Sequence, residues 1–136
     1  MADAVSFPDL EDEIRIHLAD IPAFSTVTIA AGTKPSTISG RFIFIGRTGG
    51  FVSSHVIDTA QITIECYSST SVDAFHLASA VRTQLHLAAL SGYIHSAVVS
   101  SVSELSAIYR DPDSTVADMF RYSATYRIAA RGRVAD

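Results

Sequence analysis

The chain has 136 residues, of which 48% are hydrophobic and 18% are charged. This length suits one domain with a single core, and the apolar balance excludes an intrinsically disordered chain. The formal net charge of −4 argues against a domain that holds nucleic acid by neutralising phosphates, and no apolar run is long enough to cross a bilayer.

The cysteine content and the first residues bear on where the chain is made. Cys66 is the single cysteine, so the chain cannot form an internal disulfide. Residues 1–12 are acidic and lack the basic-then-apolar order of a signal peptide. We therefore expect synthesis in a reducing cytoplasm. Acidic residues dominate the first twenty positions and arginines the last sixteen, which indicates either two solvated faces or complementary surfaces on neighbouring copies.

A helix is predicted to begin at residues 6–9, where Ser6 can cap it and Pro8 suits the first helical position. Leu10, Ile14 and Leu18 recur on one face, and the segment ends before the next proline, at position 22. The sequence therefore predicts an amphipathic helix of about three turns.

Two strands are predicted next, over residues 27–30 and 41–45, and the second is apolar on both faces. Two adjacent glycines, Gly49 and Gly50, then follow and favour a turn or a mobile tip. Because residues 51–58 have no clear period, we expect residues 46–58 to form a projecting loop.

The segment from residue 60 to 67 alternates cleanly between apolar and polar side chains, as a strand with one buried face does. Thr70 and Asp73 have the spacing of a capping box, and a long helix is predicted from there to about Leu90, ended by Gly92. Its apolar stripe comprises Phe75, Ala78, Val81, Leu85 and Ala89, and is widened by Leu77, Ala80 and Ala88.

Two further strands are predicted over residues 93–102 and 119–131, separated by a turn at residues 110–114. In the last strand, one face carries Phe120, Tyr122, Ala124, Tyr126 and Ile128, and the other carries Arg121, Ser123, Thr125, Arg127 and Arg131. The aromatic face is suited to packing against a helix.

The order of these elements favours an α+β fold with a mostly antiparallel sheet and two helices packed on one face. Residues 1–136 are expected to form one domain.

Residues that would support catalysis or metal binding are scarce. The five histidines have none of the spacings typical of a metal site, and no nucleophile elbow is present. Cys66 falls on the apolar face of a predicted strand, which indicates a buried thiol. Asp58 and Glu65 give only a weak signal for paired-carboxylate chemistry. We therefore expect no enzyme activity, no cofactor and no metal.

Four segments in this order resemble a known family. They are an apolar strand running into Arg47-Thr48-Gly49-Gly50, the alternating strand at residues 61–67, the helix start at residues 74–82, and the closing strand at residues 122–132. Over residues 7–132, the chain resembles the tail terminator (tail completion) proteins of long-tailed bacteriophages, particularly those infecting actinobacteria.

The resemblance implies an α+β domain that forms a ring, expected to be hexameric, at the head-proximal end of the tail. One face would contact the tail tube protein and the other a head-completion or neck protein. DNA would pass through the ring without sequence-specific binding. The protein would then be part of the virion, with no membrane contact.

Within that expectation, three surfaces are candidates for contact. The tube or neck docking loop comprises Arg47, Thr48, Gly49, Gly50 and Phe51. An inter-subunit strand presents Arg121, Thr125, Arg127 and Arg131, unless these are an ordinary solvated face. An acidic helix carrying Glu11, Asp12 and Glu13 would face the channel. The alternatives are a neck or head-completion connector, or a monomeric binding module or small enzyme with a polar pocket.

Overall fold

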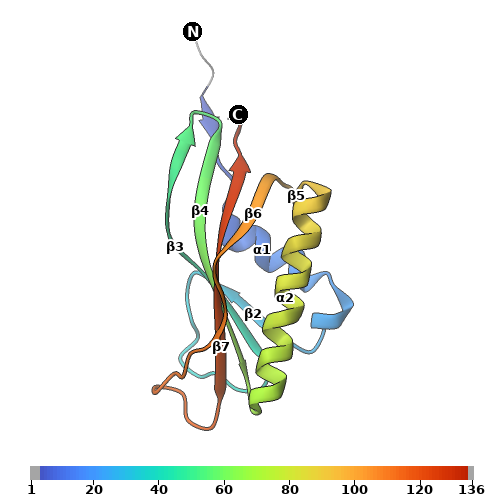
Figure 1. Cartoon of the computed structure of the whole chain (residues 1–136), viewed down its shortest axis with the longest axis vertical. Coiled ribbons are helices and arrows are strands. Elements are labelled where there is room, and N and C mark those ends of the chain that lie inside the picture. Colours follow the sequence, from blue (N-terminus) through green and yellow to red (C-terminus); the bar gives the residue numbers. More distant parts are fainter. Residues whose placement is uncertain (1–3, 135–136) are drawn as a thin grey trace.

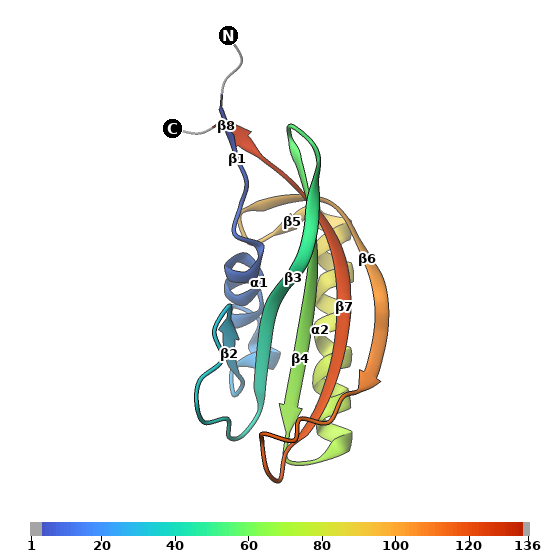
Figure 2. The same ribbon diagram turned by 90° about the vertical axis from the view of Figure 1, so that its left-hand side faces the viewer.

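A computed structural model describes residues 4–134 of the chain (Figure 1). Two helices, α1 (Leu10–Ala19) and α2 (Ser71–Ser91), pack on one face of a sheet, as the sequence predicts (Figure 2). The remaining elements are β1 (Val5–Ser6), the 3-10 helix η1 (Pro22–Phe24), β2 (Thr28–Ala31), β3 (Phe42–Ser54), β4 (Ile57–Ser68), β5 (Tyr93–Ile94), β6 (Ala97–Arg110), β7 (Phe120–Arg131) and β8 (Arg133–Val134). The α+β class is confirmed.

Within residues 4–134, six strands form the main sheet in the order β2-β3-β4-β7-β6-β5. All neighbours are antiparallel except β2 and β3, which run parallel. The two strands at the chain ends, β1 and β8, pair separately with each other. The mostly antiparallel sheet that the sequence predicts is therefore observed, with one parallel edge strand added.

The core lies between the helices and one face of the sheet. The α1 stripe of Leu10, Ile14 and Leu18 is fully buried, as predicted from its spacing. On the sheet, the alternating side chains of β4 and β7 lie opposite each other, so Ile64 faces Ala124 and Ile62 faces Tyr126. These residues belong to one continuous cluster that both helices cover.

The predicted stripe of α2 needs one correction. Leu77, Val81 and Leu85 are buried as the spacing indicates, but Phe75 is 44% exposed. Its ring packs edge-on against Tyr122, with the ring centroids 5.6 Å apart. Ala74 takes the core position instead, because the helix is rotated so that the small residue faces the sheet.

The helix ends follow local chemistry. Thr70 caps α2 by accepting a hydrogen bond from the Asp73 amide at 3.2 Å, and Gly92 ends it with a φ of 84°, as expected. The predicted cap of α1 is wrong, because Ser6 pairs with β8 and Asp9 caps the helix. The sequence pattern contained no sign of that distant pairing.

Two predicted boundaries also differ. Residues 46–58 do not form an irregular loop, because β3 continues through the glycines to Ser54 and pairs with β4 as a hairpin. Gly49 and Gly50 adopt φ values of 150° and 123°, which distort the strand without ending it. The predicted strand at residues 93–102 is divided by a tight turn at His95, whose φ is 51°.

Candidate docking surface

Residues 46–58, which are the outer part of β3 and the turn into β4, project beyond the layer of helices (Figure 2). We call these residues the hairpin arm. They include the predicted docking residues Arg47, Thr48, Gly49, Gly50 and Phe51. The sequence therefore identified a projecting element but missed its regular structure.

A partly buried ion pair runs along the hairpin arm, from Arg47 to Asp58, which lies opposite Val52 close to the turn. The Arg47 guanidinium donates two hydrogen bonds to the Asp58 carboxylate, at 2.7 and 2.8 Å, and a third to the Gly49 carbonyl at 3.1 Å. The hydrogen bonds to Asp58 raise the pKa of Arg47 above its usual value. The Arg47 amide also donates to Glu11 of α1 at 3.0 Å. Because a bidentate pair constrains direction as well as distance, the arm leaves the domain at a defined angle.

The end of the hairpin arm is apolar and exposed. Phe51 and Val52 are each 57% exposed, and Val56 is 38% exposed. The Gly132 amide donates to the Val56 carbonyl at 2.7 Å, which ties the turn to the chain after β7. Between the arm and β7 lies a hollow of about 260 Å³, lined in part by Phe51, Gln61 and Arg127.

The four β7 residues that the sequence assigned to subunit contact occupy different environments. Arg121 is largely buried, at 14% side-chain exposure, and its guanidinium lies within 3.2 Å of both Asp111 and Asp113. Thr125 bonds to Thr63 at 3.0 Å, whereas Arg127 and Arg131 are exposed.

The backbone of β7 is not available for pairing with another copy. Hydrogen bonds to β4 and β6 already occupy both edges of this strand. Another copy could therefore contact β7 only through side chains, on the face of the strand that carries Arg127.

The acidic residues of α1 are also used within the chain. Asp12 forms an ion pair with Arg15 at 2.7 Å, and Glu11 accepts the Arg47 amide. The Glu13 carboxylate accepts hydrogen bonds from the amide and hydroxyl of Ser96, at 3.2 and 2.6 Å. Glu13 is therefore a structural group at the β5–β6 turn and does not present a free charge.

A pair of histidines at this turn escaped the sequence analysis. His95 lies 2.6 Å from the Glu13 carboxylate, and its amide donates to Nδ1 of His17 at 2.9 Å. Burial lowers the pKa of His17, and the neighbouring His95 adds to this effect. Glu13 and His17 are four residues apart on α1, which is the one signal in the sequence that they share a face.

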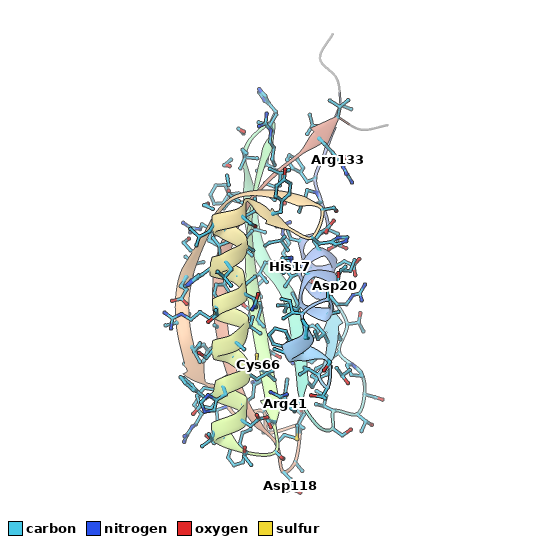
Figure 3. The ribbon with its side chains drawn as sticks, turned by 90° about the vertical axis from the view of Figure 1, so that its right-hand side faces the viewer. His17, Asp20, Arg41, Cys66, Asp118 and Arg133 are labelled. Atoms are coloured by element: carbon cyan, nitrogen blue, oxygen red, sulfur yellow. The ribbon has the colours of Figure 1, made fainter. Side chains whose placement is uncertain are left out.

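The candidate catalytic groups have structural surroundings. Cys66 is 1% exposed in the core between the sheet and α2 (Figure 3), and burial raises the pKa of its thiol. Glu65 lies beside Lys34 and Arg121, and Asp58 holds Arg47. Within residues 4–134, no three His, Cys, Asp or Glu residues lie close enough to hold a metal ion, and no helix is long and apolar enough to cross a membrane.

No family model and no curated protein sequence matches the chain. Among solved structures, the fold is similar to that of a chain in the "virion of native gene transfer agent (GTA) particle". The TM-score is 0.54 at 12% sequence identity, and the match covers 90% of this chain and 95% of that chain. At this identity the likeness establishes a shared fold across nearly the whole length of both chains.

Proposed function

We propose that the chain is a structural component of a phage-type virion and has no catalytic role. The observation that carries the proposal is the fold shared, end to end, with a chain of the gene transfer agent virion. Coverage of both chains is almost complete, so the likeness concerns the whole domain and not a common substructure.

Within that class, we propose a tail terminator, as the sequence resemblance implies. Copies of the chain form a ring, expected to be a hexamer, on the head-proximal end of the tail tube. One face contacts the tube protein, and the other contacts a head-completion or neck protein. A head-to-tail interface repeated by rotation must either close or grow without limit, and a terminator requires closure.

The hairpin arm is our candidate for contact with the tube or neck. Its apolar side chains Phe51, Val52 and Val56 gather at the end of a projecting element. The ion pair between Arg47 and Asp58 holds that element in one orientation. A preorganised apolar tip loses little conformational entropy on binding, so it suits a static structural joint.

Two further surfaces belong to this proposal. The exposed Arg127 and Arg131 would contact a neighbouring copy through side chains, together with Thr125, while Arg121 is enclosed by Asp111 and Asp113 at the other end of β7. On α1, Glu11 and Asp12 would repel passing DNA and keep it from binding the channel. Glu13 contributes to that helix by holding the β5–β6 turn.

Electron microscopy of particles made without the protein tests the function. The proposal expects tail tubes of uncontrolled length. Tails of normal length beside heads that fail to join them would indicate a head-completion connector instead. Complete, infectious particles would refute a structural role, and a monomeric binding module would then be the better interpretation.

Surface variants test the arm separately. Val52→Ser combined with Val56→Ser removes apolar side chains from the tip and leaves the ion pair intact. The matched control is Val72→Ser with Leu90→Ser, because both residues lie on α2 and are 67% and 86% exposed. We expect only the arm variant to lose binding to tails. Equal capping by both variants would show that the arm is not the contact.

A further inference from the structure

The main sheet has long unpaired edges on both sides. On one side, β5 pairs only with residues 97 and 98 of β6. Within the described chain, residues 100–110 of β6 have no backbone hydrogen-bond partner apart from β7. On the other side, β2 pairs only with residues 42–45 of β3, so that among residues 4–134 only β4 pairs with residues 49–54. In Figure 2, β6 lies at the margin of the sheet. An open strand edge presents a row of amides and carbonyls.

β-bulges interrupt both edge strands, and the regular stretches between them are residues 49–52 of β3 and 101–104 of β6. Other features that usually prevent strands from pairing between molecules are missing. Such edges are commonly protected by lysine or proline, and residues 46–54 and 97–110 contain neither. Two of the charges on these strands are paired within the chain, Arg47 with Asp58 and Glu104 with Arg82 at 3.0 Å, whereas the Arg110 guanidinium donates to the hydroxyls of Ser71 and Tyr122. Leu105 and Tyr109 of β6 are instead 45% and 44% exposed.

The two edges also lie at the same height across the sheet. One row of registered partners is Gly49, Gln61, Arg127 and Ser103. The next such row is Phe51, Thr59, Ala129 and Ser101. A rotation about an axis parallel to the strands would therefore bring residues 48–52 of one copy level with residues 100–104 of the next.

The strand directions agree with such a rotation. Three successive antiparallel pairings separate β3 from β6, so these two strands run in opposite directions. Rotation about an axis parallel to the strands preserves direction. The β3 edge of one copy would thus meet the β6 edge of the next as an antiparallel pair, with roughly one hydrogen bond per residue.

We propose that the hairpin-arm edge of β3, residues 48–54, pairs antiparallel with the open β6 edge of a second copy of this chain. The inference rests on the proposed ring and adds a backbone contact between its subunits to the side-chain contact proposed for Arg127 and Arg131. A two-fold contact between two β6 edges would leave the β3 edge open beside the exposed Phe51, whereas the head-to-tail pairing covers both edges. The heterologous arrangement is also the one that builds a ring.

Disulfide trapping tests the pairing in the purified full-length protein. Phe51→Cys and Ser101→Cys place thiols on opposite edges at one height, and directly opposed antiparallel residues have the Cα separation that a disulfide needs. Ser103→Cys tests a register shifted by two residues. The native Cys66 is buried and does not compete. Thr83→Cys, on the exposed surface of α2, is the matched control.

We expect a mixture of Phe51→Cys with Ser101→Cys or Ser103→Cys to crosslink about tenfold or more faster than either protein alone, because pairing raises the effective thiol concentration. A chain that carries both cysteines should give closed multimers. Rapid crosslinking of Ser101→Cys alone would establish the two-fold contact and overturn the proposal. Crosslinking of every mixture at the Thr83→Cys rate would also overturn it.

The trapping experiment separates this inference from the terminator assignment. Specific crosslinking together with normal tails in particles that lack the protein would leave the edge pairing in place and remove the terminator role. Overlong tails without specific crosslinking would support the terminator and show that its subunits meet elsewhere.

Discussion

The ion pair between Arg47 and Asp58 in the hairpin arm predicts an asymmetric response to mutation. The Asp58 side chain is 6% exposed, whereas the Arg47 side chain is 34% exposed. Replacing Arg47 with alanine leaves a buried carboxylate without its counter-charge. Replacing Asp58 leaves a guanidinium that reaches water and keeps its hydrogen bond to the Gly49 carbonyl. The first change should therefore cost more stability than the second.

The expected magnitudes follow from these exposures. Removing one partner of a buried pair costs about 3 kcal/mol when the remaining charge stays buried, so we expect this loss for Arg47→Ala. Asp58→Ala should cost about 1 kcal/mol, since the arginine rehydrates. The double variant should be more stable than Arg47→Ala alone, because it no longer buries a charge.

Urea unfolding at pH 7, followed by circular dichroism, measures all three free energies. For a domain of this length, 1 kcal/mol corresponds to a shift in Tm of about 3 °C, so the single variants should differ by roughly 6 °C. Equal losses, or a larger loss for Asp58→Ala, would refute the assignment of the buried charge to Asp58. A double variant less stable than both single variants would show that the two residues do not act as a buried charge and its counter-charge.

Three further predictions concern other parts of the molecule. The lowered pKa of His17 means that the unfolded chain binds its proton more readily, so stability should decline as pH falls below the ordinary value of 6.5, and His17→Gln should flatten that part of a Tm–pH profile. Gly50→Ala should cost about 3 kcal/mol, because its Cβ would collide with the Thr59 carbonyl oxygen, while Gly49→Ala, with open space around it, should cost about 1 kcal/mol in the same urea assay. Cys66 should react with a thiol reagent only as fast as the domain unfolds, which stopped-flow labelling measures, and rapid labelling of the native protein would contradict its burial.

Local patterns predicted most of the elements. The apolar spacing of α1, the alternation of β4 and β7, and the Thr70 and Gly92 signals of α2 each lie within a few residues of chain. Failures occurred where a distant partner decided the outcome. Ser6 pairs with β8 and does not cap α1. Residues 46–54 remain a strand because β4 lies beside them.

The candidate site shows the same division. The sequence located residues 46–58 as a projecting segment and identified Cys66 as a buried thiol. It treated Arg121 and Arg127 as equivalent, although one is enclosed by Asp111 and Asp113 and the other is exposed. Residue type does not specify which of two like charges will meet a carboxylate from another segment.

The sequence by itself determined the α+β class, the two helices and the apolar faces, because helical and strand periodicities are properties of neighbouring residues. Only the tertiary structure decided the strand order, and with it the enclosed position of β7 and the open edges of β3 and β6. It also brought Glu13 and His17 to the turn at His95. The physical reason is that backbone pairing between strands is nearly independent of side-chain type, so the strand that occupies an edge depends on how the whole chain packs.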